Sequence, residues 1–253
     1  MARCAPVPLN PNAITNGECD MRLYIIRHAD PDYPNNTITP AGHLEAQALA
    51  KRMATHGLDR IYASPMGRAQ DTMRYTAEAL GMTHEVEEWT QELSLKLEET
   101  PYGRLSHWDL PGEVIRSGER MPTAENWHEI SYYHGTPSRE TFEKLQTFSD
   151  EFLKRQGFER VGGRYRILKK TQDRVAVFCH GGFGLTWLAH LLEIPLSLVW
   201  AGFWMPPSSV TTILFDERSQ EWATPRCIGF GDVSHLYEAG LPVRPRGIIA
   251  NFD

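Results

Sequence analysis

The sequence lacks paired cysteines and an excess of positive charge, and both absences narrow the functions open to it. Its four cysteines (Cys4, Cys19, Cys179 and Cys227) are scattered over 253 residues, with no CxxC pair and no zinc-like spacing. Lys and Arg number 26 against 32 Asp and Glu, which gives a formal net charge of −6. This balance argues against a nucleic-acid-binding face and against a polybasic membrane surface. We therefore expect neither nucleic acid nor a membrane as a partner.

Long apolar runs are also missing. The most apolar stretch, residues 183–205, contains His190, Glu193 and Pro195, so a membrane span is not expected. Prolines and asparagines occupy the first 20 residues, where a secretory signal needs an apolar block of about 7–15 residues. We expect residues 1–20 to form a flexible leader and the protein to be cytoplasmic. With 41% hydrophobic residues, the remainder is long enough to bury a sizeable core.

Short apolar runs alternate with helical patterns along the chain. Residues 23–26 (Leu-Tyr-Ile-Ile) are typical of a strand buried on both faces. Thr39-Pro40 and Ser64-Pro65 each join an N-cap residue to a proline at the first helical position, which predicts helices that end at Gly57 and Gly81. The patterns also predict strands at 60–63, 175–179 and 210–215, a hairpin around 162–163, and helices that open at 136–137 and run through 185–192.

This alternation predicts an α/β fold with a mostly parallel central sheet and helices on both faces. We expect one domain over residues 21–253. The segment at about 92–135 does not follow the alternation of strand and helix patterns. It is long and carries Trp108 and Trp127 among prolines and glycines. Such an insertion usually has a covering role, and we interpret it as a lid over a site.

Two of the predicted strands end in a histidine, Arg27-His28 after the first and Cys179-His180 after a later one. In open α/β sheets the ligand crevice lies outside the carboxyl ends of the strands, so these histidines are expected to meet there. A third strand ends at Ser64, and Arg68 falls in the first turn of the helix that follows. Two arginines and two histidines in one crevice make a cationic pocket that suits a phosphoryl group. One imidazole can act as the nucleophile.

These residues resemble a known family. The segments Ile26-Arg27-His28-Ala29, Ser64-Pro65-Met66-Gly67-Arg68-Ala69 and Cys179-His180-Gly181-Gly182 are similar, in this order, to the motifs of the histidine phosphatase superfamily, the phosphoglycerate-mutase-like proteins. The resemblance implies that His28 takes the phosphoryl group as a phosphohistidine and that Arg27, Arg68 and His180 bind its oxygens. It also implies that Glu92 protonates the leaving oxygen and then activates water. No metal and no other cofactor are implied.

The chain departs from the family pattern at several positions. Ala29 stands in place of the usual glycine and Asp30 in place of the usual glutamate. The Trp-Asn pair and the longer Leu-Asn-Glu-Arg-Tyr-Gly-like stretch of the mutases are missing, which favours a phosphatase over a mutase. Asn35, Thr39 and Gly181 are assigned as substrate-binding residues. The general acid could also be a glutamate near Glu92.

Alternative functions remain open at this stage. They are phosphoglycerate-mutase-type transfer, a catalytically silent phosphate-binding module and, given ten histidines, a metallohydrolase. The absence of HxxxH and HExxH patterns counts against the metallohydrolase, and the absence of GxSxG counts against a serine hydrolase. The expected partner is a small phosphorylated substrate. Its identity is not encoded in these motifs, and a homodimer is left open.

Overall fold

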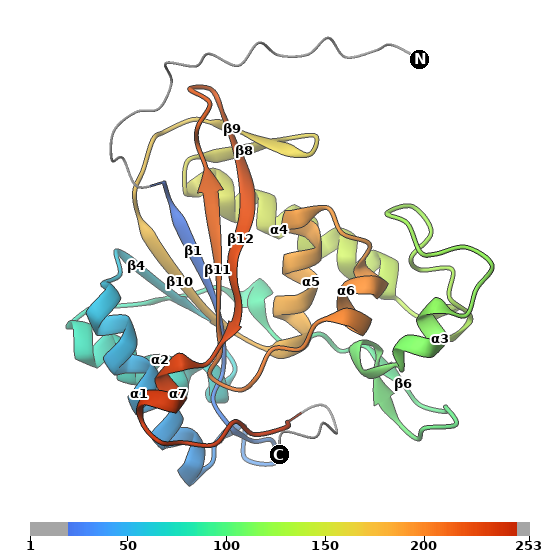
Figure 1. Cartoon of the computed structure of the whole chain (residues 1–253), viewed down its shortest axis with the longest axis horizontal. Coiled ribbons are helices and arrows are strands. Elements are labelled where there is room, and N and C mark those ends of the chain that lie inside the picture. The colour runs from blue at the N-terminus through green and yellow to red at the C-terminus, as the bar shows by residue number, and fades with distance from the viewer. Residues whose placement is uncertain (1–19, 247–253) are drawn as a thin grey trace.

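A central eight-stranded sheet organises the protein, which we describe from a computed structural model over residues 20–246 (Figure 1). The predicted leader at 1–20 lies outside the described residues except for Asp20. In spatial order the strands are β5 (Glu85–Val86), β4 (Arg60–Ala63), β10 (Arg174–Cys179), β1 (Arg22–Arg27), β11 (Val210–Asp216), β12 (Trp222–Asp232), β9 (Arg164–Ile167) and β8 (Phe158–Val161).

The first four strands of this order run parallel and confirm the predicted α/β fold. β11 joins β1 in the antiparallel direction, and β12, β9 and β8 continue antiparallel, so the sheet is mixed. The predicted hairpin at 162–163 connects β8 and β9. β12 extends the sheet beyond the strands that the sequence patterns predicted.

Helices cover both faces of the sheet (Figure 1). The main ones are α1 (Pro40–His56), α2 (Gly67–Leu80), α4 (Ser138–Arg155), α5 (Gly181–Leu192) and α6 (Leu196–Gly202). Tyr24 and Ile26 of β1 pack in one apolar cluster with α1 and α2, while Leu23 and Ile25 pack in the other with α4 and α5. Successive side chains of a strand point to opposite faces, so an unbroken apolar run is what two covered faces require. Within residues 20–246, no helix combines the length and the apolar character that crossing a membrane requires.

The remaining elements are short. They are β2 (Pro31–Asp32), β3 (Thr37–Ile38), η1 (Glu88–Thr90), β6 (Lys96–Leu97), β7 (Leu105–Ser106), η2 (His107–Asp109), α3 (Gly112–Arg116), η3 (Ser131–Tyr133) and α7 (Ser234–Glu238). The predicted insertion contains β6 through η3, drawn in green beside α6 in Figure 1. Its Trp127, named above as a lid residue, is instead buried in the core against Phe142 and Trp200.

The start of α2 differs from the prediction. Thr39 caps α1 as expected, through its Oγ1 and the Gly42 N–H, but Ser64-Pro65 does not begin α2. That helix begins at Gly67, after Met66, and has no side-chain cap. The Ser64 hydroxyl does not cap α2 and instead bonds His180, 2.8 Å away. At this position a hydrogen bond between distant residues replaces the helix cap that the local sequence favours.

Gly67 allows a close approach between α2 and the loop before β3. A Cβ at this position would overlap the backbone carbonyl oxygen of Asn36. We expect Gly67→Ala to lower the free energy of unfolding by about 1–3 kcal/mol, measured by urea denaturation, because the loop must move away. Gly163→Ala is the matched control, since its Cβ would meet only Glu193 Cγ at 3.9 Å. Equal stability of the two variants would contradict this interpretation.

Candidate active site

The parallel pairing of β1 and β10 places the two strand-end histidines side by side. Arg27 is in register with Cys179, and the backbone N–H of His28 donates to the Cys179 carbonyl at 2.9 Å. The ring centroids of His28 and His180 are 5.1 Å apart, although 152 residues separate them in the sequence. Both side chains are buried, with 1% and 0% of their surface exposed. The predicted meeting of the two histidines is therefore present in the structure.

His28 is held in one tautomer. Its Nδ1 lies 2.8 Å from the backbone carbonyl of Ala29, which can only accept a hydrogen bond, so Nδ1 carries the proton. The lone pair is then on Nε2. Burial and the nearby Arg27 guanidinium hold the pKa of His28 well below its usual value, so the ring stays neutral. A neutral imidazole with a free ring nitrogen is the form that a nucleophile needs.

His180 is oriented by Ser64. The Ser64 hydroxyl lies 2.8 Å from Nε2 of His180 and also accepts from the Met66 N–H at 3.3 Å. If the hydroxyl proton points to Nε2, Nδ1 of His180 carries a proton, and this atom is buried without a partner. Burial, with His28 and Arg68 close by, holds the pKa of His180 well below its usual value. The ring can thus offer one neutral N–H donor.

Arg27 and Arg68 bring two buried positive charges to the same place. Arg27 donates from Nη1 to the carbonyls of Met205 and Arg246, and Arg68 donates from Nη1 to Asn36 Oδ1 at 3.1 Å. Among the described residues, Nε of each arginine is buried without a hydrogen-bond partner. Both side chains are about 95% buried, at 5% and 6% exposed. Unpaired buried N–H groups are costly, and an anion placed among them would satisfy them.

The Glu92 side chain is hydrogen-bonded to the first turn of α5. Its carboxylate accepts the N–H groups of Phe183 at 2.8 Å, Leu93 at 3.1 Å and Gly182 at 3.2 Å. These bonds join the insertion to the helix that follows His180 and hold the carboxylate in one orientation. Burial lowers the pKa of Arg68. The nearby Glu92 carboxylate acts in the opposite direction, but its effect is smaller.

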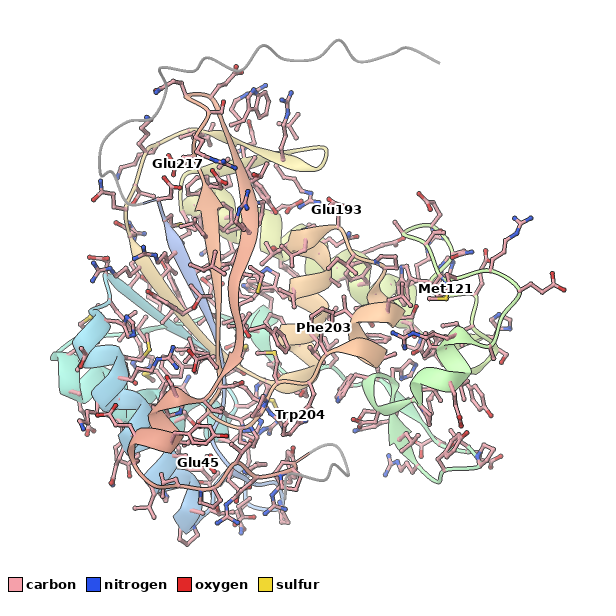
Figure 2. All side chains as sticks on the ribbon, in the orientation of Figure 1. Glu45, Met121, Glu193, Phe203, Trp204 and Glu217 are labelled. Atoms are coloured by element: carbon pink, nitrogen blue, oxygen red, sulfur yellow. The ribbon has the colours of Figure 1, made fainter. Side chains whose placement is uncertain are left out.

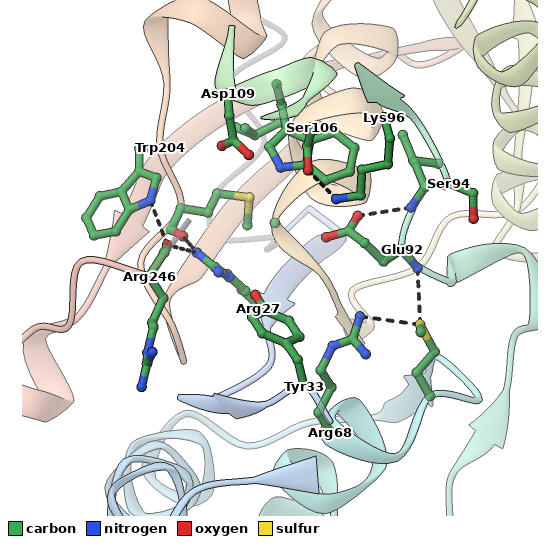
Figure 3. A pocket seen from close by; sticks show the side chains of 16 residues that line it. Arg27, Tyr33, Arg68, Glu92, Ser94, Lys96, Ser106, Asp109, Trp204 and Arg246 are labelled. Carbon is green, nitrogen blue, oxygen red and sulfur yellow. Dashed lines mark hydrogen bonds between the residues drawn. The ribbon is translucent and has the colours of Figure 1, made fainter. Parts of the chain in front are cut away.

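A cavity of about 510 Å³ opens over these residues (Figure 3). Its lining includes Arg27, Arg68, Glu92 and Gly181, four of the residues assigned from the sequence. His28 and His180, both buried, do not line it themselves, although their chain neighbours Arg27 and Gly181 do. In Figure 3, Lys96 and Asp109 lie across the cavity from Arg68.

Asn35 and Thr39, assigned above as substrate-binding residues, do not line this cavity. Asn35 is exposed and its side-chain amide donates to Asp32 at 2.8 Å. Thr39 caps α1 and donates to the buried Asp30 at 2.6 Å, so its hydroxyl has a structural role. In the same loop, Asn36 accepts from Arg68 and Tyr33 lines the cavity.

Several cavity residues carried no signal in the sequence analysis. They are Tyr33, Ser94, Lys96, Ser106, Asp109 and Arg246. Trp204 also lines the cavity. Within residues 20–246, no group of three or more His, Cys, Asp or Glu side chains is arranged to hold a metal ion.

Burial of neutral His28 has a consequence for stability in acid. The pKa of a histidine is near 6.5 in an unfolded chain and lower for the buried His28 in the folded protein. As the pH falls below about 6.5, the unfolded chain therefore binds a proton that the folded protein does not, and the folded protein loses stability. We expect unfolding free energies from urea denaturation between about pH 7 and 5 to fall more steeply for the intact protein than for His28→Asn. The difference in slope should approach about 1.4 kcal/mol per pH unit. Parallel profiles would show that the pKa of His28 is the same in the folded and the unfolded protein.

Solved structures with the same fold include two that are named as phosphatases. The phosphoserine phosphatase of Entamoeba histolytica, in complex with 3-phosphoglyceric acid, has a TM-score of 0.59 and 18% identity, covering 85% of this chain and 99% of that one. A mycobacterial glucosyl-3-phosphoglycerate phosphatase has a TM-score of 0.53 and 16% identity, covering 83% and 98%. At these identities the likeness shows the fold alone.

Curated relatives are also distant. A "Putative phosphoserine phosphatase 2" of Hydrogenobacter thermophilus is 26% identical over 52% of this chain and 64% of its own length. A "Probable phosphoglycerate mutase GpmB" of Yersinia pestis is 25% identical over 44% of this chain and 58% of its own length. The matches thus span less than two thirds of either relative. The family model of the histidine phosphatase superfamily (branch 1) matches residues 23–227, and the chain belongs to this superfamily of phosphatases and mutases.

Proposed function

We propose that the chain is a phosphomonoesterase that needs no metal ion and works through a phosphohistidine at His28. The observation that carries the proposal is a set of three buried nitrogens without a hydrogen-bond partner, Nε of Arg27, Nε of Arg68 and Nδ1 of His180, beside Nε2 of His28. The arginine atoms are N–H donors, and Nδ1 of His180 is one when the Ser64 hydroxyl donates to Nε2. A phosphoryl group carries negative charge on its peripheral oxygens, which such donors stabilise in the transition state. We infer that the substrate enters through the 510 Å³ cavity, from here on the catalytic cavity, whose lining includes Arg27 and Gly181, the chain neighbours of His28 and His180.

In the first step, Nε2 of His28 attacks phosphorus and the bond from phosphorus to the ester oxygen breaks. Glu92 gives its proton to the leaving oxygen, and the alcohol departs. In the second step, Glu92 takes a proton from water while the water oxygen attacks phosphorus. The bond from nitrogen to phosphorus breaks, its electron pair returns to His28, and inorganic phosphate leaves. Arg27, Arg68 and His180 hold the phosphoryl oxygens throughout.

The mutase alternative is weaker on the chain's own residues. A mutase must return the phosphoryl group to a bound acid and not to water, and the mutase motifs noted above are missing from this sequence. Phosphoserine and 3-phosphoglyceric acid appear in the names of similar proteins. Those names describe the similar proteins and do not identify the substrate of this chain.

The nucleophile can be tested with para-nitrophenyl phosphate in excess EDTA. We expect the intact protein to hydrolyse this ester and His28→Ala to lose the activity, since the variant lacks the ring nitrogen that is proposed to attack phosphorus. His43→Ala is a matched control, because that ring bonds Tyr75 and lies outside the catalytic cavity. Turnover by His28→Ala at the rate of the intact protein would show that the nucleophile is another group. Activity only after addition of a divalent ion would favour a metallohydrolase.

The role of Glu92 can be tested through the leaving group. We expect Glu92→Gln to lower the hydrolysis of an alkyl phosphate by about 10²–10⁴-fold, because an alkoxide needs a proton to leave. The pre-steady-state burst of para-nitrophenolate should fall less, since that anion leaves unprotonated. The exposed Glu88 supplies the control variant Glu88→Gln. An equal loss with both leaving groups would assign the proton transfer to a different residue.

A further inference from the structure

A second chamber adjoins the catalytic cavity. Its volume is about 840 Å³, larger than the catalytic cavity, and the two share six lining residues: Tyr33, Trp108, Asp109, Leu185, Trp204 and Arg246. The chamber lies between the insertion, the end of α6 and the segment before residue 247. Figure 2 shows Phe203 and Trp204 in the stretch that leaves α6. A substrate whose phosphoryl group is at His28 would direct its alcohol portion toward this space.

The walls of this chamber are mainly apolar and aromatic. Tyr102, Trp108, Trp200, Phe203 and Trp204 line it with leucines and prolines. The charged residues that line it, within the described part of the chain, are Asp109 and Arg246. Arg246 is already paired with the buried Asp30 at 2.6 Å. Burial raises the pKa of Asp109 to about 6, so its carboxyl is mostly ionised at neutral pH and repels a second anion.

The tryptophans of the chamber are held in place. The indole N–H of Trp200 donates to Thr186 at 3.0 Å, and that of Trp204 donates to the Arg246 carbonyl at 3.2 Å. Trp108 packs directly on Gly182, where a Cβ would approach its ring to 2.6 Å. Rigid aromatic walls bind an apolar group at a low cost in conformational entropy.

We propose that the substrate is a phosphate monoester of a bulky apolar, preferably aromatic, alcohol, which occupies this second chamber while its phosphoryl group reaches His28. The inference rests on the proposed function, because it takes the phosphoryl end to be at His28. A small hydroxy acid phosphate would fill the catalytic cavity and leave the aromatic walls in water. Lys96, which bonds Ser106 in the catalytic cavity, is a feature that would favour an acidic alcohol.

Phosphonates test this preference without any dependence on turnover. The probes are methylphosphonate, 1-naphthylmethylphosphonate and 3-phosphonopropanoate, with binding to the intact protein measured by calorimetry. We expect the naphthyl probe to bind at least about tenfold more tightly than methylphosphonate, because an apolar pocket commonly discriminates by such factors. The carboxylate probe should bind no better than methylphosphonate.

Phe203→Ser and Tyr102→Ser remove walls that belong to the second chamber alone. Both should reduce the advantage of the naphthyl probe about tenfold and leave methylphosphonate binding unchanged. Tyr237→Ser is the matched control, since Tyr237 is 78% exposed and outside both cavities.

Tightest binding of 3-phosphonopropanoate, or equal binding of all three probes, would overturn the inference and leave the proposed function intact. Naphthyl selectivity in a protein whose His28→Ala variant still hydrolyses esters would overturn the proposed nucleophile and uphold the ligand class. Failure of all three probes to bind would contradict both.

Discussion

The register between β1 and β10 is the constraint on which the site depends. Because side chains alternate along a strand, a slip of one residue would turn every side chain of β1 to the opposite face. The apolar residues of β1 are buried on both faces, so the cores fix this register through the size and shape of the side chains. Its consequence is that Arg27 pairs with Cys179, and His28 and His180 leave the sheet together. The packing that stabilises the cores therefore also sets the relative positions of His28 and His180.

The protein has a net negative charge, yet two buried arginines lie at the same cavity. Arg27 and Arg68 are each about 95% buried, yet each keeps a donor without a partner, while two adjacent histidines are kept neutral by the same burial. Such an arrangement is unfavourable for a protein in isolation, since buried unsatisfied donors and like charges both cost free energy. An oxyanion offsets both costs at once. The same buried donors thus make the site complementary to an oxyanion.

Features that depend on local pattern could be predicted from the sequence, while those that depend on contacts between distant segments could not. The ends of β1 and β10, and Arg68 in the first turn of α2, follow from apolar runs and turn residues. Ser64 was expected to cap α2 because its local context favours it, but its partner is His180, 116 residues away. Asn36 and not Asn35 accepts from Arg68, while the Asn35 amide donates to Asp32. The insertion has little periodicity, so its contribution to the site required the structure.

The proposed catalysis and the proposed choice of substrate are located on different parts of the molecule. The proposed nucleophile His28 and the two arginines are on the parallel core of the sheet and the first turn of α2, whose positions follow from packing. The second chamber is built by the insertion, the end of α6 and the segment around Arg246, which have short elements and few constraints from the sheet. Solved structures at 16–18% identity retain the fold while their names give different substrates. Changes in such walls can alter the alcohol that is accepted without moving His28, and this separation is why the motifs identify the chemistry but not the substrate.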